Sequence, residues 1–225
     1  MNNITVIENK RENTVIMNNQ PLSQLLISGF SQPPDDYVGV TKVLDASSDK
    51  SFLDTWRKRV GEVEADRIVK ESTDIGSSFD NLMFNHLQGI DVSDRTDEMG
   101  FNLYKQSLKH LKHIEPIALQ FHCHSHKLKM HGYIDCLCYY KGKLTVLDFK
   151  NSKKAKLPEY LDGYWKQCTF YSMMLYDMYN IKIEQIVLFI GLRNFPYPQI
   201  EIEKPKNYIK ECLESYKIYK GKLNG

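Results

Sequence analysis

Long apolar runs and a secretion signal are both missing from this chain. No hydrophobic stretch approaches the roughly 20 residues needed to cross a bilayer. The first residues, from Met1 onward, show no charged segment followed by an apolar one. We therefore expect a soluble, intracellular protein with no membrane partner.

The cysteines form neither a disulfide pattern nor a zinc pattern. Their number is odd, and no two are spaced as C-x-x-C, which argues against a disulfide scaffold and against structural zinc. Free cysteine is among the most buried residue types, so we expect buried thiols. The five are Cys123, Cys136, Cys138, Cys168 and Cys212.

Net charge carries little information, whereas local charge carries more. The 225 residues include 30 Lys and Arg against 28 Asp and Glu, a formal charge of +2. Between Lys141 and Lys156, however, six lysines accompany a single acid, Asp148. Such a basic strip suits a phosphate backbone, although a solvated loop would have the same composition.

Hydrophobic periodicity predicts an α/β protein with helices first and strands later. We interpret residues 1–36 as an N-terminal extension that could contain a short strand or two. Residues 37–225 are predicted to form a single domain. Its first part, 37–115, is mainly helical, and its second part, 116–225, contains the sheet and its flanking helices. The predicted helices span 51–73, 75–87, 97–113, 159–179 and 207–220, and the predicted strands span 117–125, 130–140, 143–150 and 183–192. Because the segment 130–150 is apolar on both faces, we expect a central mixed sheet with helices on both sides.

Two carboxylates and a lysine share one predicted β-hairpin. The dipeptide Lys141-Gly142 between two apolar runs is a two-residue turn signal. Counting back from this turn sets Asp135 opposite Asp148, and such partners have Cβ atoms about 5 Å apart on one face. Lys150 lies two residues beyond Asp148 and therefore points to the same face.

Facing carboxylates in an apolar hairpin repel each other unless a cation compensates them. A hard divalent ion such as Mg²⁺ accepts such oxygen ligands, and a nearby ammonium adds a positive point charge. This set suits phosphodiester hydrolysis, in which a metal activates water and a lysine orients that water or offsets developing charge. An ordinary salt-bridged hairpin is the alternative reading of the same residues.

A row of histidines precedes this hairpin. His122, His124 and His126 alternate, so on a strand they would share one face. Adjacent imidazoles can bind a transition metal. We favour a solvated or nucleic-acid-facing strand surface.

Several short motifs occur in a fixed order along the chain. They are Val40–Leu44, the Trp56-containing segment 52–61, Gly132-Tyr-Ile-Asp135, Asp148-Phe-Lys150-Asn-Ser152 and Gln167-x-x-x-Tyr171. Their order over 37–192 resembles that of the RecB-like branch of the PD-(D/E)xK nucleases, in particular mitochondrial genome maintenance exonuclease and its phage relatives. The single D-x-K motif is weak evidence, whereas the ordered set is specific.

The resemblance implies a PD-(D/E)xK core and a Mg²⁺- or Mn²⁺-dependent exonuclease. Its partner would be DNA, single-stranded or at duplex ends, in replication, recombination or repair. Asp135 and Asp148 would bind the metal with the carbonyl of Phe149, and Lys150 would be the catalytic lysine. A phage origin would place the protein in the host cytoplasm.

The nucleic-acid contacts implied by the resemblance lie on three segments. They are Gln167 and Tyr171 on the long helix, Ser152, Lys153 and Lys154 after the D-x-K motif, and Trp56, Arg57 and Arg59 on the first helix.

The chain departs from the family pattern at two positions. Asp80 stands where relatives carry a histidine and could itself bind the metal, while Gln120 stands where many carry glutamate. A catalytically weakened nucleic-acid-binding relative and a structure-selective endonuclease are therefore alternatives. No cysteine precedes Cys123, so the iron–sulfur cluster of some relatives is not expected.

Overall fold

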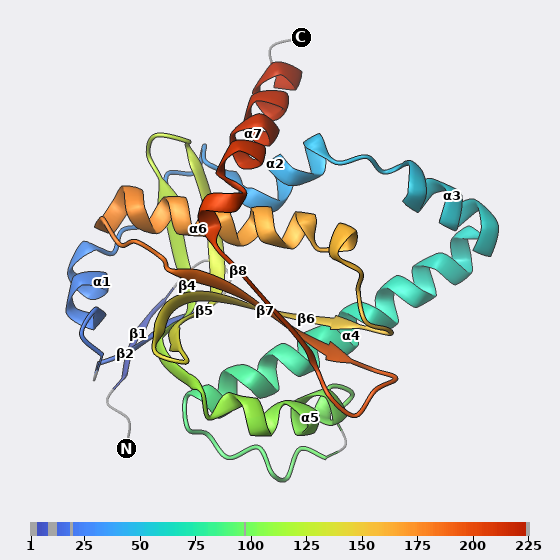
Figure 1. Ribbon diagram of the computed structural model, residues 1–225, viewed down its shortest axis with the longest axis horizontal. Helices are drawn as coiled ribbons and strands as arrows, with labels where there is room; N and C mark the ends of the chain where they lie inside the picture. The colour runs from blue at the N-terminus through green and yellow to red at the C-terminus, as the bar shows by residue number, and fades with distance from the viewer. Residues whose placement is uncertain (1–3, 9–12, 19, 97, 224–225) are drawn as a thin grey trace.

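The computed structural model describes residues 4–8, 13–18, 20–96 and 98–223. Within these residues the chain forms an α/β fold with seven α-helices and one mixed sheet of eight strands (Figure 1). The strands are β1 (Ile4–Ile7), β2 (Thr14–Met17), β3 (Val38–Gly39), β4 (Ile114–Ser125), β5 (Met130–Tyr140), β6 (Lys143–Ser152), β7 (Gln185–Leu192) and β8 (Gln199–Glu203). The helices are α1 (Ser23–Gly29), α2 (Val40–Ser47), α3 (Ser51–Val60), α4 (Glu62–Leu87), α5 (Phe101–Leu111), α6 (Asp162–Tyr179) and α7 (Ile209–Leu223).

The predicted hairpin is the centre of the sheet. Lys141 and Gly142 have φ angles of 51° and 75°, the two positive values of a tight hairpin turn, and Tyr140 pairs with Lys143. The sheet order is β1-β2-β4-β5-β6-β7-β8, with the short β3 parallel to β5. Because β6 pairs with β7 in parallel and with β5 antiparallel, the sheet is mixed, as expected.

Helices cover both faces of the sheet, which confirms that prediction. One face packs against α6, with α1, α2 and α7 contributing Leu26, Val43 and Cys212. The opposite face packs against α4 and α5, for example through Phe79 and Leu103. Figure 1 shows α6 and the α4–α5 pair on opposite sides of the strands.

The described part of 1–36, expected to be an extension, packs into the sheet. β2 pairs with β4 through Val15 and Ile16, and β1 pairs with β2. The side chain of Ile16 enters one core and that of Val15 the other. A strand buried on both faces is an integral part of the sheet.

The helical half is divided at a different residue from the one predicted. Gly61, with φ of 86°, ends α3, and α4 then runs unbroken from Glu62 to Leu87. The predicted break near Asp74 was wrong because 72–74 contains polar residues but no helix breaker, whereas glycine adopts positive φ readily. In the described part of the chain, no helix is both long and apolar enough to span a membrane.

Candidate active site

The three predicted catalytic groups lie together in the structure. Lys150 Nζ is 2.5 Å from Asp148 Oδ2, and only 2% of the Asp148 side chain is exposed. Lys150 Nζ also donates to the Phe149 carbonyl at 3.2 Å. The ammonium therefore contacts two of the oxygens predicted to bind metal.

Asp135 reaches this group through an irregularity in two strands. Leu119 and Cys136 lie in the core beneath α4, whereas their neighbours Phe121 and Ile134 lie in the core beneath α6. Between these two pairs, the side chains of each strand therefore change from one face of the sheet to the other. Gln120, which lies between the pairs in β4, has a φ of 48°. Regular alternation, which would put Ile134 on the face of Cys136, fails at this point.

The paired residues of β5 and β6 end at Cys136 and Leu147, just before Asp135 and Asp148. Instead of a ladder bond at this position, the Phe149 N–H donates to Asp135 Oδ2 at 2.9 Å. The carboxylate therefore sits against the β6 backbone, one residue from Asp148.

The charges of the site interact strongly. Burial first, and then the Asp148 carboxylate, raise the pKa of Asp135 well above its usual range. Burial acts to lower the pKa of Lys150, but Asp148 and Asp135 together raise it above its ordinary value. Lys150 therefore remains an ammonium at neutral pH, while the two carboxylates compete for a single positive charge.

Asp80 approaches this group from α4. Its carboxylate contributes to the raised pKa of Asp135, and it lines a cavity of about 390 Å³ together with Gln120. Among the described residues, however, no three His, Cys, Asp or Glu side chains are grouped closely enough to hold a metal ion. Asp80 therefore lies near the pair without completing a three-carboxylate set.

The donors that remain still suit a hard divalent cation. Asp148 is buried and Asp135 is half-buried, their mutual repulsion is incompletely offset, and the Phe149 carbonyl is a further oxygen. Oxygen ligands of this kind are those that Mg²⁺ and Mn²⁺ prefer. A cation at Asp148 and Phe149 would have to share these oxygens with the Lys150 ammonium or displace it.

Helix α6 closes the site from one side. Tyr171 is 4% exposed and its hydroxyl accepts a hydrogen bond from Gln167 Nε2 at 2.9 Å. Burial, followed by Asp148, raises the pKa of Tyr171 well above its usual range. Tyr171 therefore lies close enough to feel the Asp148 charge, and Gln167 donates to its hydroxyl. A contact of either residue with nucleic acid stays a prediction.

The basic strip begins beside the site. Lys153 and Lys154 are exposed, and Ser152 Oγ donates to the Lys154 carbonyl at 2.7 Å. Lys150 and Lys156 both lie over the ring of Tyr164, at 5.5 and 5.6 Å from its centroid. Tyr164 was not singled out from the sequence, where nothing distinguishes it from other helical tyrosines.

The predicted contacts on α3 divide into two kinds. Arg57 pairs with Glu62 at 2.5 Å and Asp66 at 2.8 Å, so it clamps α3 to α4. Arg59 is exposed and Trp56 is half-buried. Figure 1 shows α3 on an arm formed with the start of α4, away from the strands. The structure does not bring these residues to the carboxylates.

The predicted solvated surface is wrong for His122 and His124, which are buried, while His126 is exposed. These rings pair with other histidines, and no group of metal-binding side chains forms within the described residues. His122 Nε2 lies 3.1 Å from His131 Nδ1, and His124 Nε2 lies 3.4 Å from His126 Nε2. The ring of Tyr133 stacks on that of His122 at 4.1 Å.

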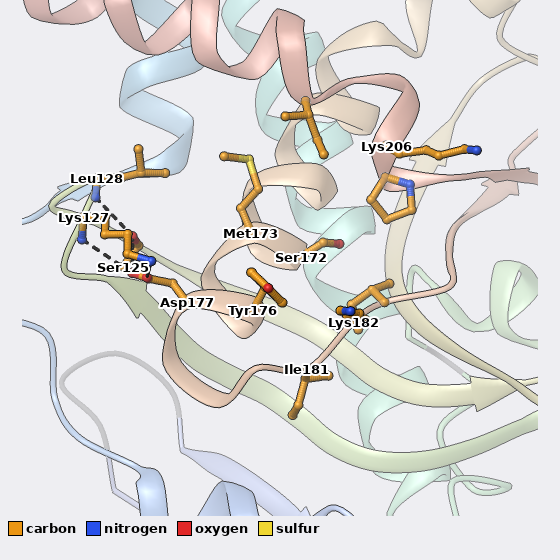
Figure 2. Close-up of a pocket in the computed structure, with 13 residues that line it drawn as sticks. Ser125, Lys127, Leu128, Ser172, Met173, Tyr176, Asp177, Ile181, Lys182 and Lys206 are labelled. Carbon is orange, nitrogen blue, oxygen red and sulfur yellow. Dashed lines mark hydrogen bonds and ion pairs between the residues drawn. The ribbon is translucent and has the colours of Figure 1, made fainter.

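A pocket of about 540 Å³ lies at the other end of α6 (Figure 2). Met173 and Tyr176 from α6 and Ile181 from the following loop line it, and Asp177 is tied to Lys127 at 2.8 Å. The pocket contains none of the predicted site residues.

Comparisons with known proteins were made for the whole chain. No protein-family model and no curated protein matches it. One solved structure that it matches is titled "Crystal structure of SSO0001", with 11% sequence identity and a TM-score of 0.36 over 85% of this chain and 83% of that one. A similarity this low says nothing about activity, so the functional reading rests on the site.

Proposed function

We propose that this protein is a metal-dependent nuclease that hydrolyses phosphodiester bonds in DNA, working from single-stranded ends. One observation carries the proposal: Asp135, Asp148 and Lys150, one buried and two half-buried, meet where the pairing of β5 and β6 ends. The motif order that resembles RecB-like nucleases supports the same three residues and a PD-(D/E)xK core. A salt-bridged hairpin alone would not require a second carboxylate beside the buried one.

The residues of the site divide the chemistry between them. A bound Mg²⁺ or Mn²⁺ would polarise the scissile phosphate and make a water molecule more acidic. Asp135, Asp148 and the Phe149 carbonyl supply the oxygen donors. Because Lys150 stays protonated, it acts as a hydrogen-bond donor to the attacking water or to charge developing on the phosphate, not as a base.

The test uses end-labelled single-stranded and duplex DNA and RNA with Mg²⁺ or Mn²⁺. We expect the wild type to shorten DNA from its ends and Lys150→Ala to be slower by at least about 100-fold, the typical loss of one preorganised donor. Lys143→Ala, an exposed lysine on the same strand, is the matched control and should cleave at the wild-type rate. Wild-type cleavage by Lys150→Ala would remove the lysine from the mechanism.

Circular single-stranded DNA separates exonuclease from endonuclease activity. An exonuclease cannot begin on a substrate without ends, so we expect the circle to survive. Its linearisation would favour a structure-selective endonuclease on the same fold.

A weakened, non-cleaving relative that binds nucleic acid is the second candidate. It is favoured by the ion pair between Lys150 and Asp148 and by the lack of a three-ligand group among the described residues. Calorimetric titration with Mn²⁺ distinguishes the two, because DNA binding without metal binding would support this second candidate.

A further inference from the structure

Arg193 lies at the end of the strand pair that carries the candidate site. It follows β7, and its backbone N–H donates to the Ser152 carbonyl at the end of β6, at 2.8 Å. Since β6 and β7 are parallel, both strands end at this edge. Open α/β sheets commonly bind ligands beyond the carboxyl ends of their parallel strands.

The guanidinium of Arg193 is only partly satisfied. Its side chain is 22% exposed, Nη2 donates to Ser72 Oγ at 3.3 Å, and Nη1 is 4.0 Å from Glu71 Oε1. Nε is buried and has no hydrogen-bond partner in the described part of the chain. A buried, charged N–H without an acceptor is costly, and an anionic oxygen is the acceptor it binds best.

The carboxylate beside Arg193 is shared with another arginine. Glu71 Oε1 lies 4.0 Å from Arg193 Nη1, and Glu71 Oε2 pairs with Arg67 at 3.3 Å. Glu71 is therefore not dedicated to Arg193, whose charge stays available to a ligand.

A cavity along α4 begins at Ser72, which contacts Arg193, and extends to Asp80. Ser72, Gly76 and Asp80 are spaced four residues apart and so lie on one face of α4. Together with Asn151 of β6 they line this cavity, which has a volume of about 420 Å³. Ser72, at one end, contacts Arg193, and Asp80 lies at the end near Asp135. At 1.5 Å per residue, these ends are about 12 Å apart.

Gly76 and Asn151 set the depth of this cavity. Asn151 Nδ2 donates to the Ser72 carbonyl at 3.2 Å, and a Cβ on Gly76 would come within 2.7 Å of the same nitrogen. Asn151 Oδ1 is buried and accepts no hydrogen bond within the described residues. The small residues Ser72 and Gly76 on α4 thus leave space beside the polar side chain of Asn151.

We propose that Arg193 and Ser72 form a phosphate-binding subsite that holds the backbone of single-stranded nucleic acid about 12 Å along α4 from Asp80. The subsite rests on the proposed function, whose substrate it positions. The Nη groups of Arg193, whose side chain is partly exposed, donate to non-bridging phosphate oxygens, which the guanidinium is suited to bind. Because the contact is to phosphate, it fixes affinity and register without reading bases.

The experiment compares Arg193→Gln with Arg67→Gln. Arg67 is the matched control, since it also contacts Glu71 from the same region but is 62% exposed. Binding of a labelled oligothymidylate is measured by anisotropy with EDTA over a series of salt concentrations, and cleavage is measured with Mn²⁺. For Arg193→Gln we expect a Kd about tenfold higher and a salt slope lower by about 0.7, the value for one phosphate of a single strand. We also expect KM to rise while kcat changes less than twofold.

Arg193→Lys and thermal unfolding of each variant guard against a folding defect. The lysine keeps the charge without the planar fork, so we expect an intermediate Kd. A wild-type Kd and salt slope in Arg193→Gln, or an equal change in Arg67→Gln, would overturn the subsite. If Arg193→Gln weakens binding but the wild type cleaves nothing, the subsite stands and the nuclease proposal fails. If the wild type cleaves and the variant keeps the wild-type KM, the subsite fails alone.

Discussion

The unfavourable electrostatic interactions of the site act mainly on the Asp135 carboxyl. Burial and Asp148 raise its pKa, and the Phe149 N–H offsets this only in part. A carboxyl whose folded pKa exceeds its unfolded pKa favours folding fully only below the unfolded pKa, and this contribution is lost as pH rises through the folded pKa. Above the unfolded pKa, and so at neutral pH, Asp135 therefore opposes folding, and a bound divalent cation would relieve that opposition.

This reasoning predicts that Asp135→Asn is more stable than the wild type when no metal is present. The amide oxygen can still accept from the Phe149 N–H, while the repulsion with Asp148 is removed. We expect a higher free energy of unfolding than in the wild type at neutral pH, and a smaller gain at mildly acidic pH. Thermal unfolding at both pH values measures it.

The same variant should lose its response to metal. Mn²⁺ should raise the unfolding temperature of the wild type and leave that of Asp135→Asn nearly unchanged, because ligand binding to the native state stabilises it. An unstable Asp135→Asn protein, or one that Mn²⁺ stabilises as much as the wild type, would contradict the ligand assignment.

At the scale of elements, the site depends on how closely α6 lies on β5. A Cβ added to Gly132 would overlap the ring of Tyr171, so glycine at this position sets the distance between strand and helix. Two of the motifs, G-x-x-D and Q-x-x-x-Y, thus meet in one contact. Their spacing along the chain, 39 residues from Gly132 to Tyr171, gives no sign of this contact.

We therefore predict that Gly132→Ala destabilises the protein by roughly 1–3 kcal/mol, the usual range for overpacking, and lowers cleavage further by displacing α6. Gly163→Ala is the control: it lies in the first turn of α6, a Cβ there meets nothing within 4 Å, and alanine is the better helix former. Denaturant unfolding measures both. Equal stability of Gly132→Ala and the wild type would show that the contact is not tight.

The sequence predicted features that depend on residues close together along the chain, and missed features that depend on residues far apart. The hairpin follows from turn chemistry within 20 residues and was found, and Asp135, Asp148 and Lys150 do lie together, but the β5–β6 pairing ends at Cys136 and Leu147 and does not include the predicted Asp135–Asp148 pair. β8 was missed because its five residues, Gln199–Glu203, alternate polar and apolar at the edge of the sheet with too few positions to register. The turnover at Gln120 and Asp135 and the approach of Arg193 to Ser72 arise only from tertiary packing, which no local pattern encodes.

At the scale of the whole molecule, the sheet separates two cores that each contain thiols. Cys136 and Cys138 lie beneath α4 and α5, whereas Cys123, Cys168 and Cys212 lie on the α6 side. All five are free and buried, as the sequence predicted. Burial raises the pKa of Cys136 well above its usual range and that of Cys212 to about 12. Neither thiol is reactive while its core stays closed.

Thiol labelling therefore reports whether the two cores open together. We expect Cys136 and Cys212 to react with a thiol reagent at one common slow rate in the native protein, set by global unfolding, and all five thiols to react at once in denaturant. Mass spectrometry of quenched samples identifies the labelled residues. Cys212 lies on α7 near the C-terminal end of the described chain, and its Sγ donates to the Lys166 carbonyl at 3.4 Å. Labelling of Cys212 well ahead of Cys136 would mean that α7 detaches while the sheet and the candidate site persist.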